Sequence, residues 1–453
     1  MTNRQQKIVR ICNRVMFCAV CALGYFLPIS GALVEWGFGI SLLSYLVKRS
    51  TLYKAKIDQE FKQATLPLQD QIVRKIHIMG QAFVPVPSVV NIPLAVYAGI
   101  IFLSMGTSYY PFLSLQAFVF KFLEEIFIAF LVLEALSSRK RIKIFLSILL
   151  ISITLVTING FVQYGTGTGF LRGRILKMGR LVSSFTSGND FAVYCVTVLP
   201  VLFALSVLQG FRPSISGKQE FFSSKWFRLA AGALFTGVLG CLGLSYSRAG
   251  WLAMALALIF VIGKNKRLWT YFLLGLMAFA IIFIPKMVHE RGMNIDYDIK
   301  NVFMNVSSRN QTWANAGLII LDHPALGVGL NNYSAVSQNY DFIHSEYPHN
   351  CYLQIAAETG ILSLVVFCWF LYVLFKDAWK GLEMISEDRF LYCLQRGVIA
   401  GLGAFLFQSA FDTFFYSTQL SALMWLFIGL ILAIANVAVW HRSLPLEEEL
   451  TKG

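Results

Sequence analysis

The chain has 453 residues, of which 57% are hydrophobic and 14% are charged, and its formal net charge is +14. Many of its apolar runs are about twenty residues long, which excludes an ordinary soluble globule and predicts a polytopic membrane protein. The runs are continuous instead of alternating with period two, so helices are favoured over a β-barrel. The basic residues gather in loops on one side, which explains the charge without a nucleic-acid partner.

Hydropathy predicts about twelve membrane helices. They lie at residues 12–29, 31–47, 89–108, 112–136, 144–161, 190–209, 229–246, 250–263, 268–285, 358–375, 397–416 and 419–440. Most Lys and Arg residues fall in alternate loops, which orients the N-terminus towards the cytoplasm, and an even number of spans returns the tail at 441–453 to the same side. No cleavable signal peptide is expected, because no small-residue cleavage site ends the first apolar run.

The N-terminal half offers few candidates for chemistry. The basic loop 48–88 is partly amphipathic and is predicted to lie along lipid headgroups. Lys121 shares a helix face with Glu124 and Glu125 inside the fourth predicted span. These charges form either a self-neutralising structural pair or part of a conduction or proton path. The eight cysteines are scattered, with no pair in an outer loop, so neither a disulfide framework nor a zinc site is predicted.

Two arginine-bearing segments break the charge rule. The loop between the fifth and sixth spans carries Arg172, Arg174 and Arg180 among several glycines. Phosphate is the natural anion for such a loop, because arginine forks match its oxygens and glycine lets backbone N–H groups approach. Anchoring to lipid headgroups is the alternative. Arg248, in SYSRAGWLA, stands at the predicted outer mouth of the bundle, where it either faces water and an anion or snorkels to the interface.

The longest polar interval, residues 285–360, is predicted to cap the bundle on the outer side, and it holds four of the six histidines as well as Arg309. Arg180, Arg248, Arg309 and His349 all fall at outer ends of spans or in this cap. We therefore expect them to converge on a cavity that suits a diphosphate leaving group and a base. His323 is predicted to be structural, and His289 and His344 to be surface residues.

A metal is not expected. Asp296 and Asp298 have the spacing of the Asp-x-Asp motif, but this spacing is common by chance and lies on the wrong side of the membrane for nucleotide sugars. No cofactor is predicted either.

Four motifs in order resemble the O-antigen ligase and polymerase superfamily of polytopic GT-C-class glycosyltransferases. They are GRLVSSFTSGNDFAVY, SYSRAGWLA, SSRNQTWANAGLIILDHPALGVGLNNY and YPHNCYLQIAAETGILSL, which together extend from Gly179 to Leu364. Each motif is weak alone, and their order makes the resemblance specific. The chain would then comprise N-terminal helices (1–161), a catalytic membrane region (162–440) with its outer loop (286–357), and a cytoplasmic tail.

The resemblance implies transfer of a glycan from undecaprenyl pyrophosphate to an acceptor sugar hydroxyl at the outer face of the bacterial inner membrane. Arg248 and Arg309 match arginines thought to hold the pyrophosphate, and His349 matches the histidine thought to act on the acceptor. Arg180 and Asn189 match a looser motif, where the family often has Asn-Pro-Asn and this chain has Ser-Gly-Asn. Further candidates for substrate binding are Arg172, Arg174, Asn350 and Glu358.

The chemistry of these side chains agrees with that implication. Guanidinium groups stabilise a departing pyrophosphate without titrating, and an imidazole can accept the proton of the acceptor hydroxyl at neutral pH. A single displacement predicts inversion at the anomeric carbon. A polymerase, which joins lipid-linked repeats, is the alternative within the same family, because the motifs do not separate the two functions. A transporter or flippase is the more distant alternative, for which related halves or broken helices at midplane would be expected.

Overall fold

The computed structural model describes residues 1–61, 68–83, 88–211, 221–290, 295–340 and 347–443. These residues form helices joined by short connections. Among them there is no β-strand, only two isolated bridges, Thr168–Ile175 and Lys177–Arg180. The helices are α1 (Asn3–Phe26), α2 (Gly31–Glu60), α3 (Leu68–Phe83), α4 (Asn91–Ser104), α5 (Pro111–Ala117), α6 (Glu124–Ala135), α7 (Arg139–Thr166), α8 (Gly188–Ser206), α9 (Lys225–Leu244), α10 (Arg248–Ile262), α11 (Lys266–Glu290), α12 (Ile295–Asp322), α13 (Tyr333–Ser337), α14 (Cys351–Met384), α15 (Arg389–Gln408) and α16 (Thr418–Ser443).

Every predicted span falls on a helix. Within the described residues, eight helices are long and apolar enough to cross a membrane, namely α1, α7, α8, α9, α11, α14, α15 and α16. Two further apolar helices, α4 and α10, are shorter. The remaining two predicted spans fall on α2 and on the charged run from α5 to α6, which a π-helical segment (Phe118–Leu123) interrupts. The protein is therefore an all-helical polytopic membrane protein.

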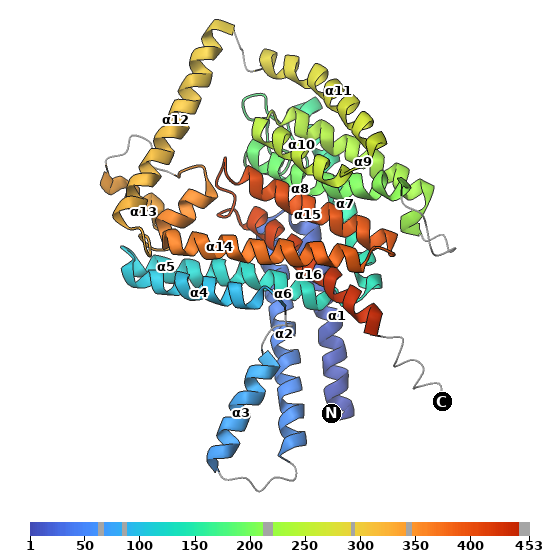
Figure 1. The fold of residues 1–453 in the computed structure, drawn as a ribbon, viewed down its shortest axis with the longest axis vertical. Coiled ribbons are helices and arrows are strands. Elements are labelled where there is room, and N and C mark those ends of the chain that lie inside the picture. Colours follow the sequence, from blue (N-terminus) through green and yellow to red (C-terminus); the bar gives the residue numbers. More distant parts are fainter. Residues whose placement is uncertain (62–67, 84–87, 212–220, 291–294, 341–346, 444–453) are drawn as a thin grey trace.

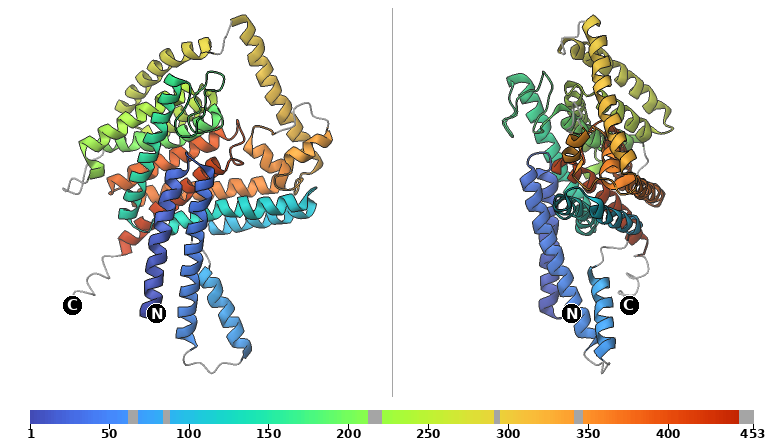
Figure 2. Two further views of the ribbon diagram at one scale, coloured as in Figure 1. Left: turned by 180° about the vertical axis from the view of Figure 1, so that it is seen from behind. Right: turned by 90° about the vertical axis from the view of Figure 1, so that its left-hand side faces the viewer.

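The helices pack around a central pair, α8 and α15 (Figure 1). Around this pair lie α9, α10 and α16, while α4 runs along α14 (Figure 1). The helices α1 and α2 form an antiparallel pair whose far end projects from the body together with α3, as the two further views also show (Figure 2). The interior is densest at α8, α15 and α16, whose side chains are almost all buried.

Glycine permits the central contact between α8 and α15. A Cβ added at Gly401 would lie 2.1 Å from the carbonyl oxygen of Thr197, and one at Gly397 would lie 2.7 Å from the Cα of Val201. Small residues bring membrane helices to backbone contact, where van der Waals packing replaces the hydrophobic effect that lipid cannot supply. This contact fixes the ends of α8 and α15, which carry parts of the site described below.

The helix α14 is broken at Gly360, which has φ 87° and ψ 163°. A turn at residues 324–329 packs into the break: the Gly329 amide donates to the carbonyl oxygen of Glu358 (2.8 Å), and the Ile361 amide donates to that of Pro324 (2.9 Å). A Cβ at position 360 would lie 1.9 Å from the carbonyl oxygen of Ala325. Only glycine allows both this backbone conformation and this approach.

Two predicted span boundaries are wrong. The tenth predicted span begins at residue 358, but α14 begins at Cys351, because the Asn350 side chain caps it by accepting from the amides of Tyr352 and Leu353. The eleventh predicted span ends at residue 416, but α15 ends at Gln408. The phenylalanines that extend the apolar run pack in the connection to α16, where Phe415 stacks on Phe405.

The predicted basic loop 48–88 is largely helical, comprising the end of α2 and α3. Near its start, the Glu134 carboxylate accepts from Lys48 Nζ and Arg49 Nη2, each at 2.6 Å, and all three side chains are mostly buried. Further along, Arg74 pairs with Glu60 at an exposed position.

Glu134→Gln is expected to lower the free energy of unfolding by about 3–5 kcal/mol, because it leaves two largely buried cations without their anion. Thermal unfolding in detergent, followed by tryptophan fluorescence, measures the change. Glu60→Gln is the matched control, since an exposed pair contributes about 0–1 kcal/mol. Equal effects of the two substitutions would contradict a structural role of the Glu134 cluster.

Candidate active site

A chain of hydrogen bonds joins four residues that lie far apart in the sequence. Arg180 Nη2 donates to Asn189 Oδ1 (2.6 Å), and Asn189 Nδ2 donates to Asp412 Oδ2 (2.7 Å). The other carboxylate oxygen of Asp412 lies 2.9 Å from His349 Nδ1. Three of the four residues, Arg180, Asn189 and His349, were predicted to belong to one site. Asp412 was not predicted, and it connects the other three.

Arg180 is held from two sides. Its Nε donates to the carbonyl oxygen of Ser245, at the end of α9 (2.8 Å), while its Nη2 reaches Asn189 in the first turn of α8. The guanidinium lies directly over Gly188, where an added Cβ would be 2.9 Å from Nε. The loop, α8 and α9 are therefore joined through one planar, five-donor group.

Gly188→Ala is expected to displace the Arg180 guanidinium and to lower activity as much as Arg180→Lys, since lysine cannot bond Ser245 and Asn189 with one fork. Gly165→Ala on α7 is the control, because nothing lies within 4 Å of its Cβ position. Initial rates of the purified variants, with circular dichroism to confirm folding, test this. A Gly188→Ala variant with full activity would show that the position of Arg180 is unimportant.

His349 is placed by the start of α14. It has φ 48°, a conformation that non-glycine residues rarely adopt and that proteins retain mainly at functional sites. Two residues later, Cys351 is bonded to the connection between α15 and α16: its amide donates to the Ser409 carbonyl (2.9 Å), and its thiol donates to the Asp412 carbonyl (3.2 Å). These bonds hold the imidazole against the Asp412 carboxylate and leave half of the His349 side chain exposed.

Asp412 is ionised at neutral pH. Burial raises the pKa of its carboxyl, but the hydrogen bonds from His349 and Asn189, the charge of His349 and the Thr413 amide outweigh burial, so the pKa lies below the ordinary value of 3.8. A carboxylate bonded to Nδ1 of an imidazole fixes the tautomer and stabilises the imidazolium that forms when the ring accepts a proton. His349 and Asp412 can therefore act as a general base and the group that orients it.

Arg248 is near this chain of bonds. It is the exposed first residue of α10, three residues after Ser245, whose carbonyl receives Arg180. Its Cα is therefore at most about 11 Å from that of Ser245. Among the described residues its side chain has no hydrogen-bond or ion-pair partner. An exposed guanidinium at this position is available to an anion.

Arg309 is not joined to the other candidates by a direct contact. It lies on α12 with a half-buried side chain that bonds none of the described residues. The later part of α12 packs on α13 and α14 through Ala316 and Ile319.

Three of the other predicted binding residues, Arg172, Asn350 and Glu358, have side-chain partners, whereas Arg174 is bonded through its backbone carbonyl. Arg172 Nη1 donates to Gln419 (3.3 Å), and the Arg174 backbone carbonyl accepts from Gln163 (2.8 Å). Asn350 caps α14. Glu358 is not at a helix start, as the predicted boundary had it, but is buried two turns into α14. Its distance from the start of the helix follows from the Asn350 cap.

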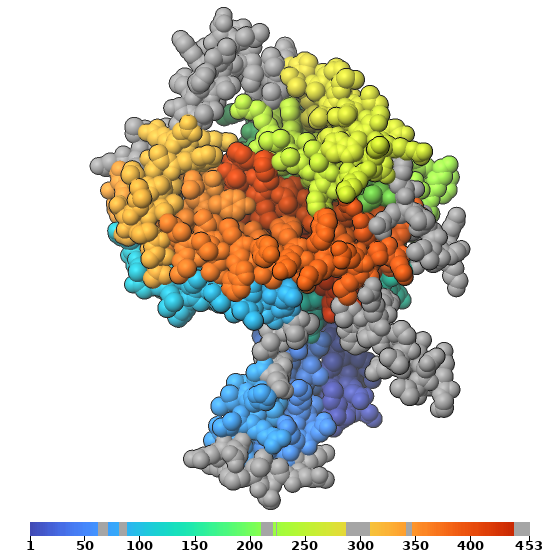
Figure 3. Space-filling model, in the orientation of Figure 1, coloured from blue at the N-terminus to red at the C-terminus, as the bar shows by residue number. Residues whose placement is uncertain are grey.

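The sequence contained a signal for Asp412. It is the single charged residue in the predicted span 397–416, and a charge inside an apolar run indicates function by default. In the structure, the connection that carries it reaches the surface between the start of α14 and the yellow-green helices α10 and α11 (Figure 3).

Two of the histidines and the Asp-x-Asp pair cannot be compared with their predictions, since the side chains of His289, His344, Asp296 and Asp298 lie outside the described residues. His323 lies with Nε2 3.2 Å from the Tyr109 hydroxyl. In the described part of the chain, no three His, Cys, Asp or Glu side chains gather in a way that could hold a metal ion.

The fold and the site define an all-helical polytopic membrane protein with a histidine–carboxylate pair that is joined through Asn189 to Arg180. Residues 232–368 of the chain match the family described as O-antigen ligase, which confirms the resemblance to the O-antigen ligase superfamily. The match contains Arg248, Arg309 and His349, whereas Arg180, Asn189 and Asp412 lie outside it. No curated protein matches the chain. The match supports a bacterial membrane protein with a ligase- or polymerase-type, glycosyltransferase-like function.

Proposed function

We propose that the protein transfers a glycan from undecaprenyl pyrophosphate to a sugar hydroxyl of an acceptor glycolipid, as an O-antigen ligase does with lipid A-core oligosaccharide. The hydrogen-bonded chain from Arg180 to His349 carries the proposal, because it holds the candidate base against a carboxylate and is anchored at Ser245, three residues before Arg248, a candidate ligand of the pyrophosphate. The enzyme is a GT-C-like protein of twelve spans in the inner membrane. Both termini are cytoplasmic, and the loop 286–357 and the site face the periplasm.

The reaction is a single displacement. His349 takes the proton of the acceptor hydroxyl, and the resulting oxygen attacks the anomeric carbon as the bond to the pyrophosphate oxygen breaks, which inverts the configuration. Arg248 and Arg309 stabilise the negative charge that develops on the pyrophosphate. Arg180 holds Asn189 and, through it, Asp412, so that His349 keeps its orientation. No step requires a metal ion.

Deletion of the gene tests the proposal. Loss of long glycan chains from the envelope, with lipid-linked polymer accumulating, is the expected result. Accumulation of single lipid-linked repeats instead would assign a polymerase, which performs the same chemistry on a different acceptor. An unchanged envelope glycan would refute both functions.

Arg309→Lys tests the pyrophosphate site. The substitution keeps the charge but removes the planar fork, so we expect the turnover to fall about tenfold or more, the equivalent of one charge-assisted hydrogen bond. Transfer from purified lipid-linked donor is the measurement, with Arg74→Lys on α3 as the control. A wild-type rate for Arg309→Lys would argue against bidentate binding of the diphosphate by this residue.

A further inference from the structure

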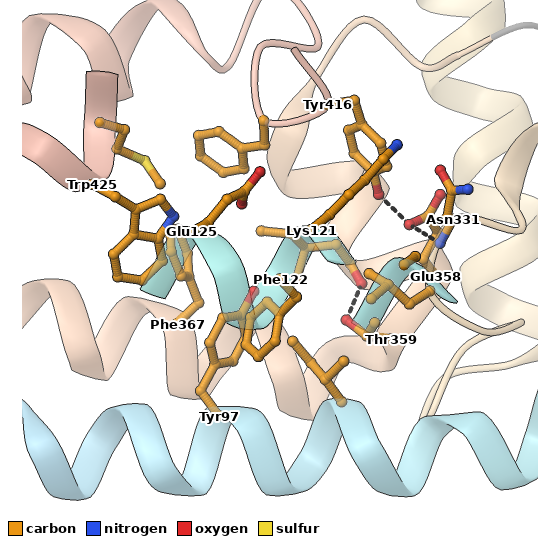
Figure 4. A pocket seen from close by; sticks show the side chains of 16 residues that line it. Tyr97, Lys121, Phe122, Glu125, Asn331, Glu358, Thr359, Phe367, Tyr416 and Trp425 are labelled. Atoms are coloured by element: carbon orange, nitrogen blue, oxygen red, sulfur yellow. Dashed lines mark hydrogen bonds between the residues drawn. The ribbon is translucent and has the colours of Figure 1, made fainter. Parts of the chain in front are cut away.

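A cavity with a mostly apolar lining and a few charged and amide groups lies next to the candidate site, between α4, the π-helical segment, α14 and the start of α16 (Figure 4). It consists of two adjoining hollows of about 70 and 300 Å³. The two hollows share Ala117, Lys121, Glu125, Asn331 and Tyr416 as lining residues. Together the two hollows lie at the lower end of the size range of small-molecule sites.

Lys121 extends into the cavity from the π-helical segment, a geometry frequent at functional sites (Figure 4). Its ammonium group makes no hydrogen bond or ion pair with any described residue. No ion pair between Lys121 and Glu124 or Glu125 therefore supports the interpretation of these charges as a self-neutralising pair. The Lys121 side chain is exposed, so that water or a ligand with acceptor atoms can reach its ammonium group.

Glu358 forms a rigid wall of the cavity. Its buried carboxylate accepts from the Asn331 amide (2.8 Å), the Tyr333 amide (3.3 Å), Gln354 Nε2 (3.1 Å) and the Tyr416 hydroxyl. Because these four donors occupy its lone-pair positions, Glu358 fixes the segments that carry Asn331 and Tyr416. The cavity is therefore built before a ligand arrives, which lowers the entropic cost of binding.

The remaining lining residues select the class of ligand. Aromatic rings face the cavity from α4, the π-helical segment, α14 and α16 and from the segment before α16 (Tyr97, Phe122, Phe367, Phe415, Tyr416 and Trp425). Four carboxylic side chains line the hollows against a single ammonium group (Glu35, Glu124, Glu125 and Glu358). With a single ammonium group, the lining offers few donors to a phosphate, and an apolar ligand would leave Lys121 unsatisfied. A neutral ligand with many hydroxyls and C–H faces suits both the polar groups and the rings.

We infer that this cavity binds a sugar residue of the glycan that takes part in the transfer. The cavity adjoins the candidate site through Tyr416, which lies four residues after Asp412 and whose ring centroid is 6.1 Å from that of Tyr347, two residues before His349. The inference rests on the proposed function for the identity of the glycan. The bound sugar belongs either to the lipid-linked donor or to the acceptor, and both present the same chemistry.

The kinetic test uses the full-length protein in nanodiscs with purified lipid-linked donor and acceptor. Lys121→Met and Trp425→Phe are expected to raise one KM at least about tenfold, the loss of a hydrogen bond to a charged group, while kcat stays unchanged. A higher KM for the donor assigns the sugar to the donor, and a higher KM for the acceptor assigns it to the acceptor. Lys264→Met, at an exposed position outside the cavity, is the control. Unchanged KM values for both substrates would overturn the inference.

A second measurement needs no turnover, so it separates failure of the inference from failure of the proposed function. Thr418→Cys, at the rim of the second hollow, is labelled with a maleimide in a background in which the exposed Cys18 and Cys368 are replaced by alanine. Oligosaccharide released from the envelope of the source bacterium is expected to slow the labelling in a saturable way. Slowing by inorganic phosphate alone, or by neither probe, would overturn the inference, even if the wild-type protein transfers glycan. Slowing by the oligosaccharide without any transfer would refute only the proposed function.

Discussion

His349→Ala is expected to lower the turnover of glycan transfer by about 10²–10⁴-fold, the usual contribution of a positioned general base. The imidazole is half exposed, and its Nδ1 is engaged by Asp412, so the ring is held where it can accept a proton from a bound hydroxyl. Transfer of labelled lipid-linked glycan to acceptor by the purified variant measures the loss. The KM for the donor is expected to change little, because the arginines that bind it remain.

The control for His349→Ala is His77→Ala on α3, in the projecting α2–α3 pair (Figure 1). It is expected to retain wild-type turnover. A His349→Ala variant that is properly folded and turns over within a fewfold of wild type would exclude His349 as the base.

Asp412→Asn is expected to lower turnover about 10–100-fold, the equivalent of losing a hydrogen bond to a charged group. Asparagine keeps the shape of the side chain but removes the charge that stabilises the imidazolium. Its amide nitrogen can also face Asn189 Nδ2 or His349 Nδ1 in place of an acceptor oxygen. The measurement is kcat as a function of pH. Because a neighbouring carboxylate favours the protonated imidazole, its removal is expected to shift the acid limb of the profile to lower pH.

The pH profile distinguishes an orienting role of Asp412 from a purely structural one. A structural role predicts a lower rate at every pH without any shift of the limb. Stability gives a separate check: because the folded pKa of Asp412 lies below 3.8, its ionised form stabilises the fold above pH 3.8, and this contribution is lost as the pH falls through the folded pKa. The wild type and the variant are therefore expected to differ in unfolding midpoint at neutral pH and to become alike in strong acid.

Helix positions were predictable from the sequence because lipid imposes one requirement, about twenty apolar residues with internally bonded backbone. Hydropathy misplaces the end of a helix where apolar side chains pack in a connection instead of in the helix. Phe414 and Phe415 pack against Phe405 in the connection after α15, and hydropathy alone counts them as part of the span. The same error hid Asp412 in a predicted helix, although it lies in the connection beside His349.

The convergence of Arg180 and His349 was predictable from the predicted topology, which places both on the outer side, whereas Asn189 was predictable only through the resemblance to a family. The capping role of Asn350 was readable from the sequence, because asparagine before an apolar helical run favours the N-cap. The burial of Glu358 was not readable, because its four donors come from three separate segments. Contacts between distant segments leave no regularly spaced pattern in the sequence from which they could be predicted.

The interruption at Gly360 divides α14 into two mechanical units. Its short first unit is fastened to the 324–329 turn and to the Ser409 carbonyl, while the long second unit runs on towards Met384. We expect tilting of the second unit, as bilayer thickness varies, to bend the helix at Gly360, so that less of the motion reaches the imidazole than through a straight helix. The reactive end of the molecule can keep its alignment while its lipid-embedded remainder adjusts to the membrane.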